Sequence, residues 1–122
     1  MERDVKFRGK QHTWVVGGFH KASDGTCSIH TDFETFTVDP KSVGEYTGIK
    51  DKNGSEIFEG DILQVDNNKS IDKWMRGETG EVKFIPARFT LCLKNGDKKM
   101  LTEDFEDCVE VIGNIYDNPD MI

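Results

Sequence analysis

The chain has 122 residues, which is enough for about one domain with one modest core. Its 10% aromatic content argues against disorder, and its net charge of −7 lacks the basic excess that is typical of phosphate-binding proteins. No apolar run approaches the roughly 20 residues that a membrane-spanning helix needs, so we expect no membrane association.

The charge is distributed unevenly along the chain. Residues 1–22 carry five basic and two acidic side chains, a local balance of +3, whereas residues 47–122 carry 10 basic and 16 acidic side chains, a local balance of −6. This asymmetry favours solubility, or else a head-to-tail contact between the basic edge of one copy and the acidic face of the next.

Apolar residues alternate along the first 40 residues, which is the period of β-strands. The predicted strands lie at residues 5–9, 13–19, 26–30 and 34–38. Gly9 and Gly17–Gly18 are interpreted as breaks, and residues 23–25 as a turn. Asp39–Pro40 ends the last of these strands, because proline has no amide proton for the ladder.

The middle of the chain is rich in turn signals. Thr47–Gly48 predicts a sharp reversal, and Asn53–Gly54 is the strongest short turn signal because both residues tolerate positive φ. A brief apolar piece at 56–58, a turn at 59–60 and a strand at 61–65 follow. We therefore expect this passage to begin a tight β-meander.

Residues 66–78 are polar except for Ile71, Trp74 and Met75, whose spacing suits one helical turn or a loop that folds its apolar side down. Tryptophan is enriched at interface hot spots. Two roles stay open for Trp74 and Met75: a lid over their own domain, or a contact with another copy or a host protein.

The sequence of the C-terminal part predicts three more strands and a short helical turn. The strands lie at 79–85, 88–93 and 108–116. A tight connection at Pro86–Ala87, a turn at Asn95–Gly96 and a return at Met100–Leu101 are expected between them, and residues 102–107 suit one helical turn with Thr102 as N-cap. The predicted fold is mainly β, a single compact domain of short antiparallel strands with at most one or two helical turns. It comprises an N-terminal β segment of residues 1–45 and a segment of residues 46–122 with the rhythm of an SH3-like barrel.

Three segments carry a family resemblance: "VKFRGK" followed by Trp14, "VGEYTGIKDKNGSEIFEGDIL" at 43–63, and "VEVIGNIYDNPDMI" at 109–122. They resemble the YopX-like family of phage and prophage proteins, and the chain diverges from that pattern over 20–42 and 64–80. The resemblance implies a phage or prophage origin, a bacterial host cytoplasm, a mainly β fold and self-association. It implies no catalytic residue.

The hallmark residues of that family have the following counterparts in this sequence: Tyr46, Thr47, Gly48, Lys50, Asp51, Asn53, Gly54, Glu59, Gly60, Asp61, Gly113, Asn114, Tyr116, Asn118 and Pro119. Turn chemistry accounts for most of the central ones, which form a structural turn motif of Gly48, Asp51, Asn53, Gly54, Gly60 and Asp61. A ligand or partner site on the same loop is the alternative.

The sequence gives little support for a metal site. His30, Asp32 and Glu34 alternate, so they would share one strand face, with Cys27 and His20 nearby; an ordinary polar strand face has the same pattern. We expect no metal and no cofactor.

The three cysteines are odd in number, form no CxxC, and follow an N-terminus without the apolar stretch of a signal peptide, which favours free thiols in a reducing cytoplasm. Cys92 shares a strand face with Thr90, opposite Phe89, Leu91 and Leu93, and is interpreted as a small filler. Because no nucleophile elbow or phosphate-binding glycine loop occurs, we expect no enzyme and no catalytic residue.

Nucleic acid is the alternative partner. The N-terminal segment places bases and one aromatic close together, namely Arg3, Lys6, Arg8, Lys10, His12, Trp14 and Lys21. The competing interpretation, which the acidic net charge favours, makes Phe7 and Trp14 core residues of an ordinary strand. The sequence thus predicts a non-enzymatic protein that acts by self-assembly and protein binding, as a homo-oligomer or with a host or phage partner. A nucleic-acid-binding accessory protein in phage replication or regulation, with Lys6, Arg8, Lys10 and Trp14 as contacts, is the alternative.

Overall fold

The computed structural model describes residues 5–70 and 72–122, so Arg3 and Ile71, which were named above, lie outside the described residues. The described chain is mainly β, its strands pair antiparallel, and its helical segments are all short 3-10 turns, which confirms the predicted fold class. No helical segment of this part of the chain is long and apolar enough to cross a membrane. The chain divides into two compact units, Met1–Tyr46 and Thr47–Ile122.

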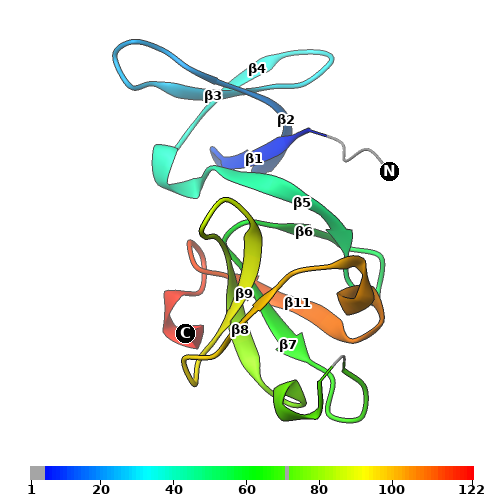
Figure 1. The fold of residues 1–122 in the computed structure, drawn as a ribbon. Helices are drawn as coiled ribbons and strands as arrows, with labels where there is room; N and C mark the ends of the chain where they lie inside the picture. The colour runs from blue at the N-terminus through cyan, green and yellow to red at the C-terminus, as the bar shows by residue number, and fades with distance from the viewer. Residues whose placement is uncertain (1–4, 71) are drawn as a thin grey trace. The chain divides into compact units, whose positions relative to one another are not determined.

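The first unit contains β1 (Phe7–Lys10), β2 (Trp14–Lys21), β3 (Cys27–His30), β4 (Thr35–Val38), the 3-10 turn η1 (Pro40–Ser42) and the start of β5 (Gly44–Lys50). The strands lie in the order β4-β3-β2-β1-β5, and Figure 1 shows β3 and β4 as a hairpin next to β2. The four strands predicted from alternation are therefore present, with ends shifted by up to two residues.

The core of the first unit forms because alternate residues point to one face of these strands. Its buried members are Cys27, Ile29 and Val38, and Phe7, Val15, Phe36 and Val43 pack against them. The breaks expected at Gly9 and at Gly17–Gly18 are wrong, since β1 continues through Gly9 and β2 continues through Gly17 and Gly18. A Cβ on Gly17 would overlap the backbone carbonyl oxygen of His30, so this glycine permits a close approach within the strand pair rather than ending the strand.

The second unit contains the rest of β5 and nine further elements: β6 (Glu56–Phe58), β7 (Asp61–Val65), η2 (Lys73–Met75), β8 (Thr79–Phe84), β9 (Phe89–Leu93), β10 (Lys98–Met100), η3 (Glu103–Asp107), β11 (Val109–Asn114) and η4 (Pro119–Met121). Its main sheet has the order β10-β9-β8-β7-β11, and β6 lies beside β5. In the described residues β10 and β11 are edge strands, so this sheet is open, and likeness to an SH3-like barrel stays a prediction.

The core of the second unit is larger and is formed by the inward faces of the sheet together with residues of two 3-10 turns. Phe89, Leu91 and Leu93 are buried on one face of β9, as their alternation predicts. Met75 of η2 and Phe105 of η3 are completely buried. Thr102 precedes η3 as expected, but its side chain makes no capping hydrogen bond; its carbonyl oxygen accepts from the Phe105 amide at 3.0 Å.

The reversal predicted at Thr47–Gly48 is wrong, because β5 runs without interruption from Gly44 to Lys50. Gly48 has a φ of 86° inside this strand, and Tyr46 and Thr47 are both buried although they are sequence neighbours. A glycine with positive φ thus shifts the alternation within a strand, as in a β-bulge, instead of turning the chain. The chain does turn at Gly60, between β6 and β7.

Candidate binding surfaces

The carboxylate of Asp51 is buried in the second unit and accepts three backbone hydrogen bonds. Oδ1 accepts from the amides of Asn53 and Ser55, both at 2.9 Å, and Oδ2 accepts from the amide of Val111 at 2.9 Å. The first two bonds close the Asn53–Gly54 turn, and the third ties that turn to β11, 60 residues further along the chain. The geometry thus gives this carboxylate a structural role.

Other polar residues of the turn motif also bond within the second unit. Asp61 is 1% exposed, and its Oδ2 accepts from the Phe58 amide at 2.8 Å across the β6–β7 turn. Asn53 does not bond its own turn through its side chain; its Nδ2 donates to Oε2 of Glu110 on β11 at 3.4 Å. Asp51 and Asp61 of the motif are therefore buried and bonded to backbone amides, whereas Asn53 is exposed.

A cationic and aromatic face covers one side of the first unit's sheet. The β1–β2 pairing sets Lys10 opposite Trp14 and Arg8 opposite Val16. The Arg8 guanidinium lies 4.6 Å from the centre of the Trp14 ring, and Lys10 Nζ lies 5.7 Å from it. Lys6 Nζ lies 4.8 Å from the centre of the Tyr46 ring. We call Lys6, Arg8, Lys10, Trp14 and Tyr46 the basic–aromatic face.

This placement corrects the interpretation of Trp14 as a core residue. Phe7 does pack against the buried cluster, but Trp14 lies on the opposite face of the strand pair and is only partly buried. Lys21 does not join the basic–aromatic face, since its partner in the ladder is the core residue Cys27. Sequence alternation alone could have placed Trp14 beside Arg8 only if the register of the hairpin had been known.

A hollow of about 400 Å³ lies in the first unit beside Lys6. Its lining includes Lys6, Val16, Gly17, Gly18, His30 and Phe33, and the ring of Phe33 is 95% exposed. We call it the Phe33 hollow. The sequence prediction missed this residue, although a phenylalanine flanked by Asp32 and Glu34 was a visible signal of a turn with an exposed ring.

His30 does not join a metal site. Its Nδ1 lies 2.9 Å from the Thr35 hydroxyl, and its ring centre lies 6.0 Å from that of His20. The expectation that Asp32 and Glu34 share its strand face is wrong, because β3 ends at His30 and the chain turns. Within residues 5–70 and 72–122, no three His, Cys, Asp or Glu side chains gather in a metal-binding arrangement.

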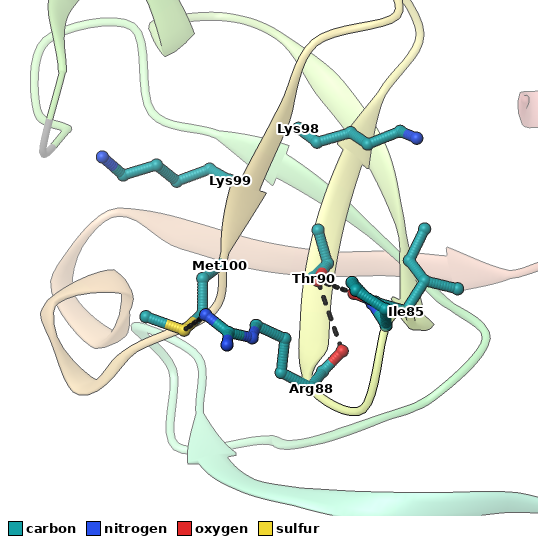
Figure 2. Close-up of a pocket in the computed structure, with 7 residues that line it drawn as sticks. Ile85, Arg88, Thr90, Lys98, Lys99 and Met100 are labelled. Atoms are coloured by element: carbon teal, nitrogen blue, oxygen red, sulfur yellow. Dashed lines mark hydrogen bonds between the residues drawn. The ribbon is translucent and has the colours of Figure 1, made fainter.

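A second hollow, of about 480 Å³, lies in the second unit at β9, β10 and the loop before β9. Ile85, Pro86 and Met100 form its apolar part, with Arg88 and Lys98 as its cations. Lys99 also contributes to the lining, but Figure 2 shows its side chain pointing to the opposite side of β10 from that of Lys98. The Thr90 hydroxyl donates to the carbonyl oxygen of Ile85 at 2.7 Å and therefore holds the loop. We call this site, lined by apolar side chains beside Arg88 and Lys98, the cationic hollow.

The turn η2 is joined to the wall of the cationic hollow. Lys99 Nζ lies 2.9 Å from Oδ2 of Asp72, the residue that precedes η2. Trp74 is 48% exposed, whereas Met75 is completely buried, so of the two candidate contacts only Trp74 can touch a partner.

The three cysteines are free thiols in this structure. Cys27 and Cys108 are buried, and Cys92 is partly exposed on β9. The Cys108 thiol donates to the carbonyl oxygen of Phe105 at 3.6 Å, which is a packing role. The position of Cys92 agrees with its interpretation as a small filler.

Comparisons with known proteins find similarity over nearly the whole chain. The model of the family described as "YopX protein" matches residues 5–122. The crystal structure of yopX from Bacillus subtilis is similar with a TM-score of 0.57 and 19% identity, and the match covers 98% of this chain and 96% of that one. The crystal structure of EF1440 from Enterococcus faecalis gives a TM-score of 0.48 and 28% identity, over 97% of this chain and 74% of that one. A search of curated protein sequences found no match.

Proposed function

The chain belongs to the YopX family, and from this premise we propose that it is a phage- or prophage-encoded, non-enzymatic protein that acts by binding other proteins, including its own copies. In this proposal it works in the cytoplasm of a bacterial host, without a cofactor. The observation that carries the proposal is the cationic hollow, since an apolar surface beside two cations, Arg88 and Lys98, suits an acidic segment with apolar side chains.

The chain itself contains such a segment. Residues 82–100, which include the lining of the cationic hollow, carry five basic side chains and one acidic, whereas residues 101–122 carry seven acidic side chains and no lysine or arginine. Because opposite charges steer association and fix its register, the acidic segment of a second copy is the partner that the hollow suits. Trp74 adds an exposed aromatic side chain, on the turn that Asp72 joins to Lys99 of β10.

The test is molar mass by light scattering over a range of protein concentrations and salt. We expect concentration-dependent association that weakens as salt rises. Arg88→Glu combined with Lys98→Glu should reduce it, whereas Lys83→Glu combined with Lys94→Glu makes the same charge change outside the cationic hollow and should reduce it less. A wild-type protein that stays monomeric at every concentration would refute self-association.

The second candidate function is binding of nucleic acid, in phage replication or regulation. The specific observation that favours it is the register of β1 and β2, which gathers Arg8, Lys10 and Trp14 on one face. The acidic net charge of the chain weighs against this function, since phosphate-binding surfaces usually carry a basic excess.

Titration of a labelled oligonucleotide at low salt tests this second function. Lys6→Glu combined with Arg8→Glu should abolish binding. Absence of binding by the wild type at about 50 mM salt would remove nucleic acid from consideration, since phosphate contacts are strongest at low salt.

A further inference from the structure

We propose that the Phe33 hollow is a base-binding pocket for single-stranded nucleic acid whose phosphates lie along the basic–aromatic face. The inference rests on the second candidate function and goes beyond it. It states that the nucleic acid is single-stranded, and it names a residue on which a base stacks.

The Phe33 hollow and the basic–aromatic face are continuous. Lys6 lines the hollow and also lies over the Tyr46 ring. Val16 lines the hollow and is the ladder partner of Arg8. A strand of nucleic acid bound to these lysine and arginine side chains therefore passes the mouth of the hollow.

The spacing of the cations suits an extended single strand. Lys6, Arg8 and Lys10 are alternate residues, so their Cα atoms are separated by about 6.6 Å along the strand. Neighbouring phosphates of an extended single strand have a similar separation. Three cations in a row can thus meet successive phosphates, which aligns the nucleic acid along β1.

The hollow offers room for a base and a ring on which the base can stack. Its volume of about 400 Å³ lies in the range of small-ligand sites. Two adjacent glycines form part of its wall, and a Cβ on Gly18 would meet nothing within 4 Å, so that part is open. Phe33 is 95% exposed, and exposed aromatic rings beside cationic grooves bind bases of any sequence by stacking.

The turn that carries Phe33 is held in place before any ligand binds. The Thr31 hydroxyl oxygen accepts hydrogen bonds from the amide of Phe33 at 3.3 Å and from that of Glu34 at 3.1 Å. The carboxylate of Asp32 in the same lining disfavours a phosphate at the Phe33 end of the hollow. The phosphates are therefore expected on the Lys6 side and the base on the Phe33 side.

Fluorescence anisotropy at low salt tests the proposal with four labelled 12-mers: oligothymidylate, oligouridylate, an abasic deoxy strand and a DNA duplex. We expect the two base-bearing single strands to bind more tightly than the abasic strand and the duplex. Phe33→Ala should weaken the binding of both base-bearing strands by about tenfold or more, and leave the abasic strand and the salt slope unchanged. Gly18→Val, which fills the hollow, should reproduce this loss. Trp74→Ala, which removes an exposed aromatic residue of the other unit, should not.

The outcomes separate the pocket from the function. Because the ring is almost fully exposed, Phe33→Ala should keep its circular dichroism spectrum. If Lys6→Glu with Arg8→Glu abolishes binding but Phe33→Ala binds oligothymidylate as the wild type does, the base pocket is refuted and nucleic-acid binding stands. Equal losses on the abasic strand also refute a stacking role. If none of the four oligonucleotides binds the wild type, both nucleic-acid binding and the base pocket are refuted.

Discussion

Replacing Asp51 is the most informative test of the turn motif. Asp51→Ala removes the acceptor of three backbone amides, two in its own turn and one on β11. Hydrogen bonds to a charged group contribute about 1.5–3 kcal/mol each, and the turn amides can regain water when the carboxylate is absent. We therefore expect the free energy of unfolding to fall by about 3–5 kcal/mol, a large part of the stability of a small domain.

Urea unfolding followed by Trp74 fluorescence, in a Trp14→Phe background, measures the loss in the second unit. Asp51→Asn keeps Oδ1 for the turn amides but turns a donor toward the Val111 amide, so its loss should be smaller than that of Asp51→Ala. Asp97→Ala removes an exposed carboxylate from another turn and should change stability by less than about 0.5 kcal/mol. A loss below about 1 kcal/mol for Asp51→Ala would refute the structural role of this carboxylate.

Three further predictions follow from other parts of the chain. Gly80→Ala should destabilise the second unit by about 1–3 kcal/mol, since its Cβ would lie 2.7 Å from the Cys92 carbonyl oxygen, whereas Gly18→Ala should be nearly neutral; urea unfolding compares them. One thiol, that of Cys92, should react rapidly with a thiol reagent in the native protein, and the buried Cys27 and Cys108 should react only after unfolding; rapid reaction of all three would contradict their burial. The Asn68 amide, and secondarily Lys52, hold the pKa of Asp66 below its ordinary value, so its stabilisation is present above that value and is lost as pH falls through the folded pKa. Asp66→Asn should therefore unfold with a weaker pH dependence in acid than the wild type.

The strands were predictable because their residues alternate, but the role of the glycines within them was not. Alternation located β3, β7 and β9 to within one residue. The prediction is wrong at Gly9 and Gly17–Gly18, which are expected as strand breaks, and at Thr47–Gly48, which is expected as a reversal. A glycine that admits a close backbone contact, or that shifts the alternation by positive φ, has the same local sequence as one that ends a strand. Only the partner across the ladder distinguishes these cases.

The candidate sites were predictable only where one strand carries them. Lys6, Arg8 and Lys10 share a face because they alternate, and this follows from the sequence. Their approach to Trp14 and Tyr46 depends on how β2 and β5 pair with β1, which the sequence does not state. The cationic hollow likewise combines the loop before β9 with β10, and the bond from Asp51 to Val111 spans 60 residues. Contacts between residues this far apart in the sequence depend on the order in which the strands pair, and the spacing of residues along the chain does not reveal that order.

The buried carboxylates of the central motif and the exposed aromatic rings have different roles. Asp51 and Asp61 direct their carboxylates at backbone amides, so they specify how the chain turns and leave little to offer a partner. Phe33 and Trp74, the exposed rings of the two proposed surfaces, lie instead within residues 20–42 and 64–80, outside the three segments that carry the resemblance. Membership of the family therefore accounts for the fold. The decisive experiments therefore change side chains that reach solvent, namely Phe33, Lys6 and Arg88, rather than the buried carboxylates of the central motif.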